Sequence, residues 1–190
     1  MSDLKIGFAM CGSFCTFAPA IKQLEKLVEK SYQVQPIMSQ IAYETDTRFG
    51  KAEDFKQKIQ DLCKKEIIHT IVGAEPIGPK KLVDLMIVCP CTGNTMAKMA
   101  NGITDGAVTM AVKSSLRNRI PVLLAIATND ALAGSAQNIG KLMNTKNIYF
   151  VPMSQDDVWK KPTSVIADFD QLIPAAMSAL KKEQLQPFLA

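Results

Sequence analysis

The residues best suited to chemistry lie just after an apolar run at residues 85–89. The turn that follows this run carries Thr92, Gly93, Asn94 and Thr95, and an apolar helical pattern comes next. Threonine hydroxyls and an asparagine amide both donate and accept hydrogen bonds, and the backbone N–H groups at the start of a helix attract anions. This turn therefore suits a ligand that carries a phosphate or a carboxylate next to a polar body.

Three other polar turns follow apolar segments of the chain: Gly12-Ser13, Ser39 and Thr128–Asp130. If the strands before them are parallel, their carboxyl ends meet at one edge of a sheet, where open α/β folds bind ligands. We therefore expect these turns to lie beside the turn at residues 92–95. The first turn contains Gly-Ser but not G-x-G-x-x-G, so the fingerprint of a dinucleotide site is absent.

The elements that must position these turns alternate between strands and helices along the chain. Apolar runs predict strands at residues 5–10, 33–38, 67–72, 85–89, 121–127 and 147–151. Helical spacing of apolar residues predicts helices at 17–28, 52–65, 95–100, 107–116, 132–143 and 165–180. This order is typical of an α/β fold with a doubly wound parallel sheet, and the length of 190 residues predicts a single domain over residues 1–190.

Prolines and glycines refine these boundaries. Pro90 is expected to end the central strand, because proline has no N–H to donate to a sheet. Pro174 predicts a kink or an earlier boundary in the last helix. Residues 41–50 read as a loop or short helix, and residues 73–79, with two glycines and two prolines, read as a loop that can lie over a site.

Composition excludes several functional classes. The net charge is +4 and the basic residues are scattered, which argues against nucleic-acid binding. No apolar run approaches the roughly 18 residues of a membrane span. The N-terminal segment lacks a basic region followed by an apolar one, so it reads as a first strand and not as a signal peptide. The odd count of five cysteines predicts reduced thiols and a cytoplasmic protein.

Three groups of side chains allow two interpretations each. His69 lies in an apolar segment and is either a structural histidine or a catalytic base. Arg117 and Arg119 either clamp a dicarboxylate or are solvated charges at a helix end. Four cysteines follow two of the strands, and their spacings differ from the usual C-x2-C, so we expect buried, inert thiols and no metal site. These cysteines are Cys11, Cys15, Cys89 and Cys91.

Three segments carry a resemblance to a known family. They are IGFAMCGS at residues 6–13, AEPI at residues 74–77 and CPCTGNTMAKMANGITD at residues 89–105. Over about residues 4–145 the chain resembles the flavoprotein family of phosphopantothenoylcysteine decarboxylase, lantibiotic cysteine decarboxylases and flavin prenyltransferases. The Ala-Thr-Asn-Asp-Ala-Leu turn at residues 127–132 is similar to that of a branch that forms pyridine-2,6-dicarboxylate during sporulation.

This resemblance implies a Rossmann-like flavoprotein fold that binds FMN. Gly12, Ser13 and Ser39 would bind the FMN phosphate and ribityl region. The flavin and substrate pocket would be lined by Thr92, Asn94, Thr95 and Thr128. Asn94 would also be catalytic, together with His69, the only histidine of the chain.

The same branch implies an oxidoreductase that works with a nucleotide-dependent partner and converts a small dicarboxylate. It also implies a homo-oligomer, a trimer or a multiple of one, in the mother cell of a spore-forming bacterium. Two alternatives stay open. One is an FMN-dependent decarboxylase or flavin prenyltransferase, and the other is a non-catalytic partner that has kept the pocket.

Overall fold

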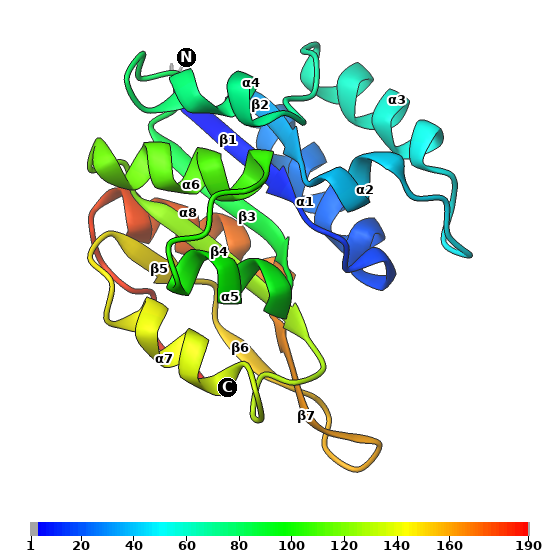
Figure 1. Cartoon of the computed structure of the whole chain (residues 1–190), viewed down its shortest axis with the longest axis vertical. Helices are drawn as coiled ribbons and strands as arrows, with labels where there is room; N and C mark the ends of the chain where they lie inside the picture. The colour runs from blue at the N-terminus through cyan, green and yellow to red at the C-terminus, as the bar shows by residue number, and fades with distance from the viewer. Residues whose placement is uncertain (1–3, 190) are drawn as a thin grey trace.

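A seven-stranded sheet forms the centre of the computed structural model, which describes residues 4–189 (Figure 1). Its strands are β1 (Lys5–Met10), β2 (Gln33–Met38), β3 (Leu85–Cys91), β4 (Val122–Thr128), β5 (Ile148–Phe150), β6 (Met153–Asp157) and β7 (Lys161–Ala167). The helices are α1 (Phe17–Glu29), α2 (Gln40–Glu44), α3 (Ala52–Cys63), α4 (Ile71–Ala74), α5 (Gly93–Ala100), α6 (Ala107–Arg117), α7 (Ala136–Met143) and α8 (Leu172–Leu180). Short 3-10 turns are η1 (Phe14–Thr16), η2 (Glu75–Ile77) and η3 (Phe169–Gln171).

The strand order β2-β1-β3-β4 is parallel throughout, which confirms the predicted α/β fold. From β1 the chain moves outward to β2 and then returns to the other side of β1 as β3. The order therefore reverses between β1 and β3, and such a switch point leaves a crevice at the carboxyl ends of the two strands. β5 continues the parallel sheet beside the first half of β4, and the antiparallel pair β6–β7 joins its end.

Helices cover both faces of the sheet and make three layers (Figure 1). Side chains alternate along β1, so that Phe8 belongs to the apolar core that includes residues of α1, α3 and α8, whereas Ala9 belongs to the core that includes residues of η2, α5, α6 and α7. Each face thus has its own apolar core, and the near-continuous apolar runs of the strands follow from burial on both sides. No helix within residues 4–189 is both long and apolar enough to cross a bilayer. The strand predicted at residues 5–10 is confirmed as β1, whereas residues 1–3 at the start of the N-terminal segment lie outside the described residues.

The prediction that Pro90 ends the central strand is wrong. β3 continues to Cys91, and its register against β4 shifts between Val88 and Cys91. The irregular pairing accommodates the residue that has no N–H, and the Pro90 carbonyl still accepts a hydrogen bond from Cys11 N at 3.3 Å. The strand therefore ends two residues later than predicted, at Cys91, and Thr92 follows it directly.

The segment at residues 67–79 also differs from the prediction. Ile68 forms a single bridge to Ile37, and the chain then turns into α4 and η2 instead of a strand and a loop. Ser114 Oγ in α6 donates to Glu75 O at 2.7 Å and accepts from Gly78 N at 2.9 Å. These bonds dock the segment on α6, so it does not lie over the site.

The C-terminal third holds the largest departure, because the helix predicted at residues 165–180 is a strand followed by a helix. Lys161–Ala167 pairs with β6 as a hairpin, and α8 begins only at Leu172. Pro174 is the third residue of α8, where no intrahelical N–H bond is needed, so the predicted kink is unnecessary. The helix predicted from residue 132 begins at Ala136, because the Leu132 N–H donates to Thr163 O of the hairpin at 3.0 Å.

Candidate functional site

The structure brings the four predicted turns together at the carboxyl edge of the sheet. Gly12 and Thr92 follow β1 and β3, the strands that flank the switch point. Ser39 follows β2, and its N–H donates to Met10 O at 3.0 Å. The turn at residues 128–130 follows β4, the neighbour of β3. The parallel pairing of β1 to β4 therefore brings the four polar turns to one edge of the sheet, as predicted.

Two adjoining cavities open at this edge, and Gly12, Thr92 and Asn94 line both. The first, of about 510 Å³, is here called the hairpin cavity, because β6 and β7 form one wall. It is lined by Gly12, Ser13, Cys15, Thr16, Thr92, Gly93, Asn94, Ala127, Thr128, Asn129, Asp130, Asp156, Lys161, Ser164, Val165 and Ile166. The second, of about 710 Å³, is called the helix cavity and is lined by Gly12, Phe14, Ser39, Gln40, Ile41, Glu44, Thr45, Thr92, Asn94, Thr95, Lys98, Asp105, Gly106, Ala107, Val108 and Thr109.

Every residue that the resemblance assigned to the cofactor lines at least one of these cavities. Ser13 and Thr128 lie in the hairpin cavity, Ser39 and Thr95 lie in the helix cavity, and the other three lie in both. Those three are Gly12, Thr92 and Asn94. The predicted set is therefore one continuous lining, although its role in binding a cofactor stays a prediction.

Asn94 lies at the wall between the two cavities, at the second position of α5. The helix begins earlier than predicted, and Thr92 is its N-cap: Thr92 Oγ1 accepts from Thr95 N at 3.3 Å. A cap residue satisfies one of the unpaired N–H groups of the first turn. Since Thr92 has this role, Asn94 is not the cap, and its exposed side chain is available to a ligand.

Gly93 allows the start of α5 to pack against the end of β4. A Cβ atom at Gly93 would lie 2.8 Å from Ser135 Oγ, 2.8 Å from Thr128 Oγ1 and 2.9 Å from Asp130 Oδ1. These three side chains are themselves joined, because Thr128 and Ser135 donate to the Asp130 carboxylate at 2.6 and 2.9 Å. The bond from Thr128, with that from Ser135, holds the pKa of Asp130 below its usual value.

The helix cavity presents groups that suit a phosphate next to a flat ring. α6 begins at its edge behind Gly106, which supplies no capping side chain, so the N–H groups of the first turn face the cavity without a side-chain acceptor. Ser39 and Thr92 add hydroxyl groups, and Phe14 and Ile41 add apolar surface. Helix N-termini and hydroxyls are the usual donors to a phosphate in proteins. The donor set therefore fits a mononucleotide cofactor.

An ion pair borders the same cavity. Lys98 Nζ lies 2.8 Å from Asp105 Oδ2, and this hydrogen bond lowers the pKa of the Asp105 carboxyl. The pair closes the gap between α5 and the start of α6.

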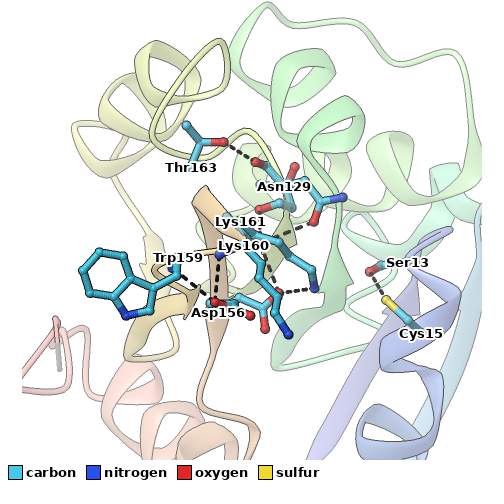
Figure 2. Close-up of polar contacts among 11 residues, drawn as sticks. Ser13, Cys15, Asn129, Asp156, Trp159, Lys160, Lys161 and Thr163 are labelled. Carbon is cyan, nitrogen blue, oxygen red and sulfur yellow. Dashed lines mark hydrogen bonds and ion pairs between the residues drawn. The ribbon is translucent and has the colours of Figure 1, made fainter.

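The cysteines occupy two different environments. Cys11, Cys89 and Cys91 are buried beneath the cavities, and burial raises the pKa of the Cys11 thiol to about 11. The prediction of a buried thiol is wrong for Cys15, which is exposed at the hairpin cavity with its Sγ 3.9 Å from Ser13 Oγ (Figure 2). Among residues 4–189, no three His, Cys, Asp or Glu side chains are grouped so as to hold a metal ion.

His69 and the two arginines are not brought to the cavities. The exposed His69 ring stacks on Tyr43, with centroids 3.9 Å apart, and does not line either cavity. Arg117 ends α6 and Arg119 follows it, just before β4 begins at Val122. Since the cavities lie at the other end of β4, the arginines cannot clamp a ligand there.

Among the lining residues that the sequence analysis missed are three polar ones from the hairpin: Asp156, Lys161 and Ser164. The apolar residues after residue 165 have helical spacing, and for this reason the sequence analysis predicted a helix where the structure has strand β7. The signal that could have revealed it is the cluster of β-branched residues Thr163, Val165 and Ile166, which favours a strand.

A parallel sheet with a crevice at its switch point is typical of the α/β proteins that bind ligands at the carboxyl ends of their strands. Comparison with known proteins identifies the family: the chain belongs to the flavoprotein family, whose model, Flavoprotein, matches residues 1–181. The chain is also 46% identical to the B subunit of dipicolinate synthase from Bacillus subtilis, over 100% of this chain and 96% of that protein.

Solved structures support the same assignment. A crystal structure of the B subunit of dipicolinate synthase from Bacillus halodurans C has a TM-score of 0.91 and 41% identity, covering 100% of this chain and 98% of that one. DmrB from Burkholderia xenovorans, solved in complex with FMN and described as a cubic protein cage for redox transfer, has a TM-score of 0.70. Its identity is 17%, over 95% of this chain and 97% of that one, so this likeness shows the fold alone.

Proposed function

We propose that this chain is the FMN-binding B subunit of a dipicolinate synthase. It acts with the nucleotide-dependent A subunit of dipicolinate synthase to convert a dihydrodipicolinate-type precursor to pyridine-2,6-dicarboxylate in the mother cell of a sporulating bacterium. The observation that carries this proposal is the 46% identity to the Bacillus subtilis protein over the whole chain. The pair of adjoining cavities supports it, because one can hold a cofactor and the other a small substrate.

FMN, when bound, can accept the two electrons that are released when a dihydropyridine becomes aromatic. The residues that would hold it are Gly12, Ser13, Ser39, Thr92, Asn94, Thr95 and Thr128. The hydroxyls of Ser39 and Thr92, with the first turn of α6, would bind the phosphate.

Asn94 would orient both ligands, because it lies at the boundary between the cavities. Its amide offers two donors and one acceptor, which matches a flavin edge or a substrate carboxylate. A side chain that holds the substrate next to the ring reduces the entropy lost on reaching the transition state. Since His69 does not line either cavity, the proposal gives it no part in this step.

The test is a visible absorption spectrum followed by an activity assay. We expect the purified protein to bind FMN and, together with the A subunit, to form pyridine-2,6-dicarboxylate. A protein that stays colourless with added FMN, yet still stimulates the A subunit, would point to a non-catalytic partner. Activity on a peptidyl cysteine or on a dimethylallyl phosphate, without formation of the dicarboxylate, would instead assign the chain to another reaction of its family.

A further inference from the structure

The β6–β7 hairpin forms the wall of the hairpin cavity that faces the switch-point turns. β7 pairs with the end of β4 through Ala127 with Ile166 and Thr128 with Val165. This pairing places the first residues of β7 at the carboxyl edge of the sheet, opposite the N-terminus of α5. The hairpin thus contributes side chains to a cavity that the parallel core alone leaves open.

Lys161, the first residue of β7, is the only cationic side chain among the described residues that line the hairpin cavity. Its Nζ lies 2.6 Å from Asp156 Oδ2 on the paired strand. An ammonium group has three N–H donors, so the pair with Asp156 leaves donors for a ligand. The side chains are 52% and 30% exposed, and a ligand that enters the cavity can therefore reach them.

The direction of Lys161 differs from that of its neighbours on the hairpin. In Figure 2 the Trp159 indole points away from Ser13 and Cys15, whereas Lys161 lies between Asp156 and that segment. Trp159 is 92% exposed, and neither it nor Lys160 lines the cavity. Two adjacent lysines therefore have the same charge but different access to the cavity.

The carboxylates of the lining do not oppose an anionic ligand as strongly as their charge suggests. Asp130 already accepts hydrogen bonds from Thr128 and Ser135. Asp156 is paired with Lys161, and the Ser164 hydroxyl lies 3.4 Å from its Oδ2. Since both carboxylates have donors within the protein, the groups left for a ligand are mainly donors, above all the Lys161 ammonium and the Asn94 amide.

We propose that Lys161 binds one carboxylate of a dicarboxylate substrate in the hairpin cavity, with Asp156 as the residue that positions its ammonium group. The second carboxylate is left to the amide and hydroxyl donors near the start of α5. The identity of the dicarboxylate rests on the function proposed above. The assignment of Lys161 rests on the cavity itself.

The experiment compares Lys161→Gln with Lys160→Gln in FMN-supplemented protein, by calorimetric titration with pyridine-2,6-dicarboxylate and with the monocarboxylate pyridine-2-carboxylate. We expect Lys161→Gln to weaken binding of the dicarboxylate about tenfold, since a charge-assisted hydrogen bond is lost at a half-exposed site. Lys160→Gln should bind within about twofold of the wild type. Raising the salt concentration should weaken binding to the wild type more than to Lys161→Gln, because ions screen the attraction.

A steady-state assay in the presence of the A subunit separates this inference from the proposed function. We expect Lys161→Gln to raise KM for the precursor with little change in kcat, as for a group that binds substrate and transition state alike. If the wild type forms product and Lys161→Gln keeps the wild-type affinity and KM, the assignment of Lys161 is wrong and the function stands. If the wild type binds the dicarboxylate through Lys161 but forms no product, the function is wrong and the site stands. A wild type that neither binds nor reacts overturns both.

Discussion

The side chain of Asn94 is an uncharged amide that lies between the hairpin cavity and the helix cavity. Replacing Asn94 tests whether this amide binds a ligand. Asn94→Asp keeps the size of the side chain and adds a negative charge near a helix N-terminus, which helix stability tolerates. Against an anionic ligand the change removes a donor, so we expect FMN or dicarboxylate affinity to fall by roughly 1.5–3 kcal/mol with little change in melting temperature.

The matched control is Asn138→Asp, the same exchange in the first turn of α7, away from both cavities. Fluorescence titration with FMN and thermal melts would be measured for both variants. Unaltered affinity in a folded Asn94→Asp protein would remove Asn94 from the proposed site.

Cys11 gives a prediction about pH. Burial raises its pKa to about 11 in the folded protein from 9.0, so the folded state keeps this thiol protonated where the unfolded chain loses the proton. The stabilisation is fully present below pH 9 and is lost as the pH rises toward 11. Since one pKa unit corresponds to about 1.4 kcal/mol, the loss is on the order of 2–3 kcal/mol.

Urea unfolding between pH 8 and 11 would measure this loss. We expect a shallower decline for Cys11→Ala than for the wild type. Parallel profiles for wild type and Cys11→Ala would show that the buried thiol does not contribute to the pH dependence.

At the scale of single elements, helix α5 has room only for glycine at its first position, Gly93. An alanine Cβ at position 93 would come within 3.0 Å of three side chains that are joined by hydrogen bonds, so they would have to move apart. We expect Gly93→Ala to reduce the free energy of unfolding by about 1–3 kcal/mol, as other overpacked sites do. Gly140→Ala in α7 is the control, because its Cβ meets nothing within 4 Å, and it should stabilise the protein by about 0.5–1 kcal/mol.

Chemical unfolding of the two glycine variants checks this pair, and FMN titration of Gly93→Ala shows whether the strain reaches the cavities. If both substitutions stabilised the protein equally, the hydrogen-bonded side chains of Thr128, Asp130 and Ser135 would have moved apart without any loss of stability.

Elements of the parallel core were predictable from the sequence because burial on both faces leaves long apolar runs. The strands β1, β2 and β4 and the polar turns behind them follow directly from such runs. The hairpin was not predictable in this way, because one of its strands is polar, from Met153 to Asp157, and the other begins Lys-Pro-Thr-Ser. What stabilises it is pairing with β4 and contact with the turn at residues 128–132, and such long-range contacts leave no local period.

Prediction of the site residues from the sequence was limited in the same way, because long-range contacts leave no local pattern. The side chains contributed by the core, such as Ser39 and Thr92, were found because they follow apolar runs at strand ends. Lys161 was not found, because its place in the lining depends on strands 30 residues or more apart in the chain. The catalytic role of His69 was an implication of the family resemblance, and the stacking of His69 on Tyr43 is a tertiary contact that the sequence does not reveal.

At the scale of the whole molecule, we expect a homo-oligomer, a trimer or a multiple of one. Ile41 lines the helix cavity and is exposed, Phe49 is also exposed, and burial of such apolar side chains between copies would be favourable. Light scattering at micromolar concentration measures the mass, and a monomer would contradict the prediction.

The attachment of the hairpin has a consequence for how such a protein can diverge. Strand β4 offers one edge to two partners in succession, with β5 along Val122–Leu124 and β7 only at Ala127 and Thr128. The two ends of the hairpin segment are joined, since Asp168 N donates to Pro152 O at 2.8 Å. Because this hydrogen bond closes the base of the segment, the segment can differ between related proteins while the parallel sheet stays the same. A conserved crevice in the parallel sheet can thus acquire new ligands through changes in about fifteen residues of the hairpin.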